Sequence, residues 1–439
     1  MQSDDPTSSS LEKRTTSKVL WRIMPLIFTL YVISYIDRAN IGYAALQMNQ
    51  ELALTSSAFG FAAGVFFIGY FLFEVPSNLA LARFGARIWI ARILISWGIV
   101  AAASAFVHSA IQLYLCRFLL GVAEAGFFPG IIIYLTYWFR AKDQAVSVAL
   151  FTAAIPVSYL IGAPLSTWIM DNVAGLGLSG WRWMLLLEGI PAVLGGIACY
   201  FLLTDKPEDA TWLTDEEKSW LAAELADERR RNPHVRTLST WQAICDPKVL
   251  VLSLIYFVYQ AGSLGVGYWM PQIIAGSSGH LSNFQIGLIS IAPYALATVA
   301  MVMWSIHSDR TGERQLHSAL PLLAAAAALA TTGLTHSLVP ALLLISTALA
   351  GLYAFKSPFW SLPGLFLSRA TAAISIAAIN SLGNLGGFVG PYLVGVVKQS
   401  TGDALSGLLF LSALLFCAFL LTRFVRFASK PHAIVSGAS

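Results

Sequence analysis

Long apolar segments alternate with short polar ones along almost the whole chain. We count twelve apolar segments, each about 20 or more residues long, which is the length that a tilted helix needs to cross a hydrocarbon core about 30 Å thick. They begin near residues 19, 57, 88, 111, 144, 181, 248, 284, 315, 338, 371 and 404. The pattern predicts an all-α polytopic membrane protein with twelve transmembrane helices.

The composition agrees with this class and argues against others. Of 439 residues, 57% are hydrophobic and only 11% are charged, and the four cysteines stand singly without metal-ligand spacing. The net charge of +4 is distributed between the apolar segments instead of forming a basic face, so we expect no nucleic-acid partner. No nucleophile–base set, metal cluster or phosphate loop is present, so we expect no enzyme, no metal and no cofactor.

The basic residues also predict the topology. Lysines and arginines precede the first segment, follow the second, fourth, eighth and tenth, and end the chain, whereas the alternate loops 47–56 and 275–283 carry none. By the positive-inside rule both termini are cytoplasmic, and we expect a multi-pass protein of the cytoplasmic (inner) membrane. We expect the protein to be a monomer that contacts membrane lipid.

A long hydrophilic stretch, 204–246, separates six segments from six. Thr214 followed by Glu217 is a capping-box signal, and an apolar stripe follows, so we expect a cytoplasmic amphipathic helix from about 215 to 231. The expected organisation is a cytoplasmic tail, a six-helix bundle, a linker with this helix, a second six-helix bundle and a second cytoplasmic tail, with bounds 1–18, 19–204, 205–247, 248–427 and 428–439.

The two halves carry matching motifs. The loop after the second segment reads RFGAR (83–87) and that after the eighth RTGER (310–314), and Pro164 and Pro391 stand at corresponding places in the fifth and eleventh segments. All four matching positions share one offset of 227 residues. This offset indicates a duplicated six-helix unit, in which a substrate site lies at the midplane between two halves that move against each other.

Four charged residues stand inside predicted spans. Arg117 and Glu124 are two turns apart on one helix face, and Asp37 and Arg38 lie near the outer end of the first span. A charge at membrane depth costs roughly 2.5–3.5 kcal/mol on insertion scales, so such residues usually face a cavity and mark function. A structural buried ion pair is the alternative. A guanidinium matches a carboxylate and desolvates readily, so the set suits an anion carrier, and carboxylates in a partly dry cavity can exchange protons near neutral pH.

The assembled motifs resemble those of the major facilitator superfamily, namely SDRTGER (308–314) and RFLLG (117–121). Further motifs look like the anion:cation symporter family, which includes bacterial permeases for galactonate, glucarate, tartrate, phthalate and 4-hydroxyphenylacetate: YIDRANIG (35–42), GVAEAGFFPG (121–130), GWRW (180–183), EGIP (188–191) and NSLGNLGG (380–387). The first-half loop departs from the superfamily pattern, because Ala82 stands where an aspartate would precede Arg83.

The resemblance implies that Asp37, Arg38 and Glu124 take part in proton coupling and substrate coordination. We assign Arg38 as the substrate-carboxylate ligand, Glu124 and Asp37 as proton-coupling residues, and Arg117 as the residue that tunes them or as the principal anion ligand. The expected gate or motif residues are Arg83, Arg87, Asp309, Arg310 and Arg314.

Several other polar residues are candidates for the substrate site. Tyr35 and Tyr70 offer hydroxyls, although aromatic residues in spans are more often packing. Asn380 and Asn384 share a helix face in the eleventh segment and either reach a substrate or bond to neighbouring helices, and we favour Asn384 for the substrate. Lys356, near the middle of the tenth segment, is expected to bind a second anionic group, which favours a dicarboxylate; pairing with a carbonyl or a carboxylate is the alternative.

Two further carboxylates are expected to serve the gate or the scaffold and not the substrate site. These are Glu74, placed toward the cytoplasmic end near Arg83 and Arg87, and Glu188, beside Arg182 in sequence.

The function that these observations favour is a proton-coupled symporter importing an organic carboxylate anion by alternating access, with H⁺ as the coupling ion. An anion exchanger or efflux carrier of the same fold is the first alternative, and a membrane sensor that binds an acid without moving it is a more distant one.

Overall fold

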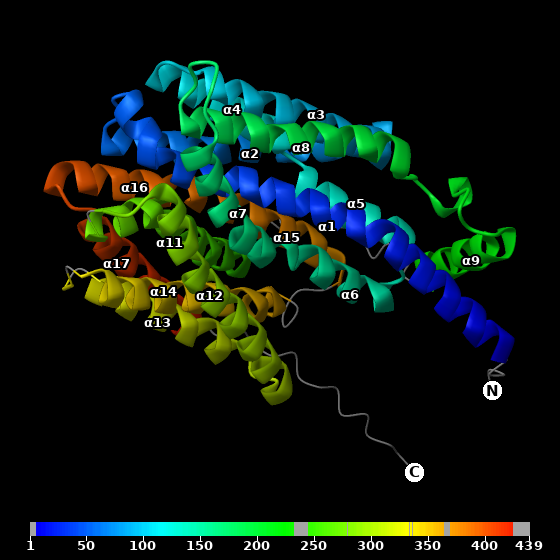
Figure 1. The fold of residues 1–439 in the computed structure, drawn as a ribbon. Coiled ribbons are helices and arrows are strands. Elements are labelled where there is room, and N and C mark those ends of the chain that lie inside the picture. Colours follow the sequence, from blue (N-terminus) through cyan, green and yellow to red (C-terminus); the bar gives the residue numbers. More distant parts are fainter. Residues whose placement is uncertain are drawn as a thin grey trace, which may run out of the picture.

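The computed structural model describes residues 6–231, 245–278, 280–332, 334–335, 337–363 and 369–424. Helices joined by loops make up nearly all of this part of the chain (Figure 1). The N-terminal half contains α1 (Pro6–Glu51), α2 (Ser56–Phe84), α3 (Ala86–Ala103), α4 (Ala110–Glu124), α5 (Phe127–Trp138), α6 (Ala141–Thr152), α7 (Ala154–Asn172) and α8 (Gly180–Leu202). The linker contains α9 (Asp215–Arg231). The C-terminal half contains α11 (Pro247–Ser278), α12 (Asn283–Thr311), α13 (Gln315–Thr332), α14 (Leu338–Ser361), α15 (Arg369–Asn384), α16 (Gly386–Thr401) and α17 (Ala404–Phe424).

Ten helical segments of the described chain are long and apolar enough to cross a membrane. They coincide with ten of the twelve segments expected from the sequence. The other two expected segments are helical as well: one is α13, and the other is divided into α15 and α16. Large apolar side chains cover the outside of the bundle, such as Leu79, Ile111 and Met303, as they do in helices that face lipid.

The predicted span that begins near residue 111 is not one continuous helix. The helix α4 ends at Glu124, and α5 begins at Phe127 after Gly126, whose φ of +84° lies in the left-handed region that favours glycine. A side chain at Gly126 would also meet the Ser77 hydroxyl on α2. Arg117 and Glu124 nevertheless stay together on α4, and both side chains are buried.

The two halves meet through equivalent helices. Across the halves, α2 packs on α16, α7 on α12 and α1 on α11. A duplication of six spans exchanges the second span with the eighth and the fifth with the eleventh, so the first two contacts correspond to each other. In Figure 1 α16 runs beside α2, while α12, α13 and α14 lie on the opposite side of α1.

The closest contacts between the halves gather at one end of the bundle, which we call the far end. It comprises the end of α1, the start of α2, the end of α7, the start of α12 and the end of α16. A Cβ atom placed on Gly395 would meet the Ser56 carbonyl oxygen, and one on Gly60 would lie 2.5 Å from the Pro391 carbonyl oxygen. Glycine therefore allows the backbones of α2 and α16 to approach closely.

At the opposite end, which we call the terminus end, α9 lies near the start of α1 (Figure 1). The helix expected from about 215 to 231 is α9, and its capping box is formed, since the backbone N–H groups of Thr214 and Glu217 each donate to the other residue's side chain. Lys18 and Arg14 of α1 donate to the Glu217 carboxylate at 2.9 and 3.1 Å. The start of α1 thus covers residues 6–18 of the expected N-terminal tail and holds the linker helix.

Candidate functional site

The centre of the N-terminal half holds a buried ion pair between α1 and α4. The Arg38 Nε donates to Glu124 Oε1 at 2.7 Å, and the Ser34 hydroxyl donates to the same oxygen at 2.7 Å. Ser34 and Arg38 lie one turn apart on α1, so that helix presents both donors on one face. Glu124 is 0% exposed. The structure therefore brings together the two residues that the sequence indicated as substrate ligand and proton carrier.

Arg117 lies close to this pair but does not form an ion pair with Glu124. Its Nε donates to the Ala62 carbonyl oxygen on α2 at 3.4 Å, and Glu124 and Asp37 act on it as nearby charges. The Phe66 ring lies beside both guanidiniums, with its centroid 5.3 Å from the Arg117 Cζ and 5.4 Å from the Arg38 Cζ. Both arginines therefore face one side of α2 at the centre of the bundle.

Asp37 faces a different group of neighbours from Arg38, the residue that follows it. Its carboxylate is buried among the charges of Glu188, Glu124 and Arg117, with the Trp97 indole nearby. Neither carboxylate oxygen forms a hydrogen bond of good geometry within the described chain. Asp37 thus contributes a third ionisable group to the same region.

Several polar atoms of this region are buried without a hydrogen-bond partner among the described residues. They are Arg38 Nη2, Arg117 Nη2, Glu124 Oε2, the Tyr268 hydroxyl and both Asp37 carboxylate oxygens. Buried polar atoms in native proteins are nearly always paired, and an unpaired charged group costs more than a neutral one. Two free guanidinium ends beside a free carboxylate oxygen have the donor and acceptor pattern that suits a polar anion carrying a proton or hydroxyl groups.

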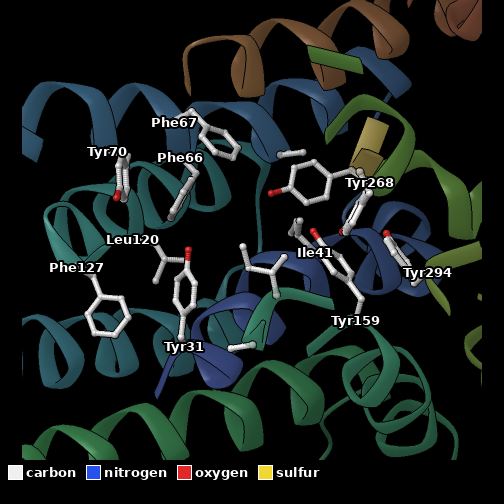
Figure 2. Packing of buried hydrophobic residues seen from close by; sticks show 14 of the residues in the cluster. Tyr31, Ile41, Phe66, Phe67, Tyr70, Leu120, Phe127, Tyr159, Tyr268 and Tyr294 are labelled. Atoms are coloured by element: carbon white, nitrogen blue, oxygen red, sulfur yellow. The ribbon is translucent and has the colours of Figure 1, made fainter. Parts of the chain in front are cut away.

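Aromatic side chains surround the charges. The Arg38 Cζ lies 5.2 Å from the ring centroids of both Tyr35 and Tyr70. Figure 2 shows Tyr70 and Phe66 on one side of the region, and it shows the hydroxyl of Tyr268, from α11, pointing toward Phe66. Tyr35 and Tyr70 therefore do lie at the centre, as expected, and Tyr268 brings the C-terminal half to Arg117.

The two asparagines of α15 have different partners. Asn384 Oδ1 accepts a hydrogen bond at 2.9 Å from Gln260 of α11 within the same half. Asn380 Nδ2 donates at 3.3 Å to Glu74 of α2 across the halves, and Ser381 donates to the same carboxylate at 2.6 Å. The partners of Glu74 are therefore not the expected Arg83 and Arg87, because α2 turns this buried carboxylate toward α15.

Lys356 lies on α14 beside Phe355, which packs on Tyr259, and its side chain is half-buried. Within the described ranges its ammonium forms no hydrogen bond or ion pair. Glu188 is also placed differently from expectation, because it accepts hydrogen bonds from Asn40 and Ser166, while Arg182 pairs with Glu51 at 2.8 Å. The partner of each side chain is set by the face of the helix on which it lies, and not by closeness in sequence.

The motif loops lie at the terminus end. Arg314 pairs with Asp309 at 2.6 Å, while the Arg310 side chain is exposed. In the first loop Asp205, from the segment after α8, accepts a hydrogen bond from the Arg87 backbone N–H at 2.8 Å. Asp205 thus holds the start of α3 beside the first motif loop. Arg83 is exposed, with its Cζ 5.7 Å from the Phe84 ring centroid.

Four residues of the central region were not singled out from the sequence. Ser34 was detectable, because it stands one turn before Arg38. Phe66, Tyr268 and Gln260 carry no signal that separates them from packing residues of other spans. In the part of the chain that the structure describes, no group of three or more histidine, cysteine, aspartate or glutamate side chains is arranged to hold a metal ion.

Comparisons with known proteins agree with this architecture. The family model of the Major Facilitator Superfamily matches residues 27–391. The chain is 47% identical over 431 residues to an Agrobacterium vitis protein named "Putative tartrate transporter", a match that covers 98% of this chain and 95% of the relative. It is 38% identical over 416 residues to the "Quinolone resistance transporter" of Acinetobacter baumannii, covering 94% of this chain and 95% of the relative.

Among solved structures, the xylose transporter XylE from E. coli in a partially occluded inward open conformation has the same fold. The TM-score is 0.74 at 17% sequence identity, and the match covers 93% of this chain and 98% of that one.

Proposed function

Because this chain belongs to the Major Facilitator Superfamily, we propose that it is a proton-coupled symporter that imports an organic dicarboxylate of the tartrate class. It works as a monomer in the cytoplasmic membrane, with both termini in the cytoplasm, by alternating access of its two halves. The observation that carries the proposal is the buried Arg38–Glu124 pair, in which the guanidinium keeps a free end. The 47% identity to a relative named as a tartrate transporter supports the substrate class.

The pair links proton binding to anion binding. While Glu124 is ionised it neutralises Arg38, so a substrate carboxylate must compete with it for the guanidinium. A proton on Glu124 removes that competition, because a neutral carboxyl group no longer holds the Arg38 charge. Proton and anion therefore favour each other's binding, and this favouring is reciprocal. Asp37, beside Glu124 and Arg117, is a second proton site.

The remaining residues orient the anion. Arg117 and the Tyr268 hydroxyl receive its distal polar groups, and Tyr35 and Tyr70 offer hydroxyls from the N-terminal half. Lys356 approaches from α14 as a second cation, and Asn384 and Gln260 contribute an amide pair from the C-terminal half. A dicarboxylate with hydroxyl groups would satisfy two cations and several neutral donors at once.

Uptake into proteoliposomes tests the proposal. Labelled tartrate, galactonate, glucarate, phthalate and 4-hydroxyphenylacetate are offered with and without an inward proton gradient. We expect tartrate to accumulate only with the gradient. We expect Glu124→Gln, which fixes the neutral form, to keep tartrate exchange and lose accumulation. Uptake that ignores the proton gradient and follows sodium or an opposing anion would contradict the coupling.

A second candidate is an efflux carrier of the same fold, which the similarity to the quinolone resistance transporter favours. The same vesicles, loaded with labelled acid or with a quinolone and given an opposite gradient, separate the two directions. Extrusion of the quinolone without uptake of any acid would favour the efflux carrier.

A further inference from the structure

A row of basic residues follows one face of the start of α1. Arg14, Lys18 and Arg22 stand four residues apart, so they project from the same side of the helix on successive turns, and all three side chains are exposed. Arg22 stands 16 residues before Arg38, or about 4.4 turns, which places it on roughly the opposite side of α1 from the central ion pair. This face therefore points away from the substrate site.

An open hollow lies beside these residues, between α1 and α9. It has a volume of about 610 Å³ and is lined by Arg14, Ser17, Lys18, Trp21, Arg22 and Glu217. Three of the lining side chains are positive and one is negative. The excess of positive charge indicates an anionic occupant, and the volume is ample for a phosphate group with a glycerol on either side.

The linker helix uses only part of this positive charge. Lys18 Nζ donates to Glu217 Oε2 at 2.9 Å, and Arg14 Nε donates to Glu217 Oε1 at 3.1 Å. An ammonium has three N–H donors, so Lys18 can bind a second acceptor. Arg22 forms no hydrogen bond or ion pair with the residues that the structure describes. Because Lys18 and Arg22 lie one turn apart, the oxygens of one phosphate group can accept from both.

Trp21 indicates that the anionic group belongs to a lipid. Its side chain is 75% exposed, and it stands where the polar start of α1 gives way to the apolar span. Tyr200 and Phe201 are exposed at the end of α8, which packs on α1. Tryptophan and tyrosine are enriched at the level of the lipid headgroups. A free phosphate ion makes no use of an exposed indole, whereas the glycerol region of a phospholipid packs on it.

We propose that this face of α1 binds the headgroup of an anionic glycerophospholipid such as phosphatidylglycerol. The phosphate oxygens accept from Arg22 and Lys18, and Trp21 packs on the glycerol region. In the orientation proposed above, the terminus end meets the cytoplasmic leaflet, whose anionic lipids attract lysine and arginine. A lipid in this hollow lies against the docked linker helix as well as against α1. The inference goes beyond substrate transport and does not depend on proton coupling.

Binding of phosphatidylglycerol with a fluorescent acyl chain, measured on the purified protein in uncharged detergent micelles, tests the site. We expect Arg22→Gln to raise the dissociation constant about tenfold, equivalent to about 1.4 kcal/mol. Arg22 is exposed, so this variant should keep the thermal unfolding temperature of the wild type in micelles without added lipid.

Lys13→Gln is the matched control. It removes the same charge from the same helix, but the exposed Lys13 stands nine residues, or about 2.5 turns, before Arg22 and therefore on the opposite face. Its dissociation constant should stay close to the wild-type value. Equal weakening by the two variants would mean that the lipid responds only to the overall positive charge, and it would overturn the site.

Competition identifies the source of the phosphate. Unlabelled phosphatidylglycerol should displace the probe, whereas phosphatidylcholine and inorganic phosphate should not. Displacement by inorganic phosphate would make the hollow a site for a soluble anion. Displacement by phosphatidylcholine as readily as by phosphatidylglycerol would show that the headgroup is not selected. Either result would overturn the proposal.

A second pair of variants separates lipid binding from the docking of α9. Lys18→Gln removes a phosphate ligand together with an ion pair, whereas Glu217→Gln removes only the competing carboxylate charge. We expect Lys18→Gln to weaken phosphatidylglycerol binding and Glu217→Gln to preserve or strengthen it. Equal weakening by both would mean that the probe requires a docked α9 and not the basic face, and it would overturn the assignment.

Discussion

Arg38 uses only part of its guanidinium within the protein. Its Nε donates to Glu124, and its Nη2 is buried without a partner. A lysine keeps the charge but cannot donate to two groups in one plane. We therefore expect Arg38→Lys to weaken tartrate binding by roughly 10- to 100-fold, about 1.4–2.7 kcal/mol. Tartrate-dependent thermal stabilisation of the purified protein measures this, and an unchanged dissociation constant would remove Arg38 from the substrate site.

We expect Lys356 to distinguish a dicarboxylate from a monocarboxylate. Its half-buried ammonium forms no hydrogen bond or ion pair with the described residues. We expect Lys356→Ala to lower tartrate exchange about tenfold and to leave a simple monocarboxylate, tested as a competitor, nearly unaffected. Equal effects on both acids would contradict a second anion site.

At the scale of single residues, the sequence predicts which charged residues lie in the central region better than it predicts their partners. Arg38, Arg117, Asp37 and Glu124 stand out because charges in apolar spans are rare. Sequence spacing on α4 favours a pair between Arg117 and Glu124, yet Glu124 pairs with Arg38. The choice depends on the rotation of α1 against α4, and no short-range pattern encodes that rotation.

Among the elements, α9 is a case in which the ends were predictable and the docking was not. The capping box locates the helix, but nothing in its charged sequence indicates that it docks on α1. Burial alone would raise the pKa of Glu217, but the hydrogen bonds from Lys18 and the Thr214 backbone outweigh it, so the pKa lies below its ordinary value. The ion pairs with α1, which is distant in sequence, thus hold this polar helix against the start of α1.

We expect Glu217→Ala to loosen α9, because it removes the shared partner of Lys18 and Arg14. Hydrogen exchange of residues 215–228 should become faster, with Asp215→Ala as the control, because the exposed Asp215 carboxylate lies near Lys218 of the same helix. The lowered pKa means that the carboxylate stabilises docking fully above the ordinary glutamate value of about 4.3, and that this contribution is lost as the pH falls through the lowered pKa. Wild-type α9 should therefore resemble the variant in acid, and equal protection of both at neutral pH would contradict the docking role.

Other elements differ from expectation where a predicted span is divided. The predicted fourth, fifth and eleventh spans are each divided, at Gly126, at Ala153 and near Leu385. Their overall length and hydropathy were predictable from composition. The break itself is a backbone conformation that Gly126 permits and that the neighbouring α2 surface requires.

For the whole molecule, the offset of 227 residues indicated a duplicated six-helix unit, and the contacts between α2 and α16 and between α7 and α12 correspond to each other under such a duplication. It could not predict which end of the bundle is closed, because the same sequence must support both arrangements. That information lies in which glycines touch across the halves in this conformation.

Substitutions at two glycines should distinguish an effect on folding from an effect on the equilibrium between conformations. A Cβ on Gly189 would lie 2.8 Å from the Ala102 backbone nitrogen inside the N-terminal half, whereas a Cβ on Gly60 would meet Pro391 across the halves. We expect Gly189→Ala to lower the thermal unfolding temperature. We expect Gly60→Ala to fold normally and to expose the far end, measured as faster labelling of a cysteine introduced at Ser57. Similar loss of folding in both variants would contradict the distinction.

The far end is closed by glycine backbones and by hydrogen bonds that involve mostly neutral amides and hydroxyls, and no ion pair joins the two halves within the described ranges. Opening this end therefore separates no pair of opposite charges, and no newly exposed ion pair has to bind counterions. At physiological ionic strength, dissolved salt weakens interactions between exposed charges over a screening length of about 8 Å. A closure without ion pairs offers few such interactions for salt to weaken. The opening rate at this end should stay nearly the same in dilute and in concentrated salt. Changes in the ionic strength of the medium should therefore leave the opening of this side of the protein unaffected.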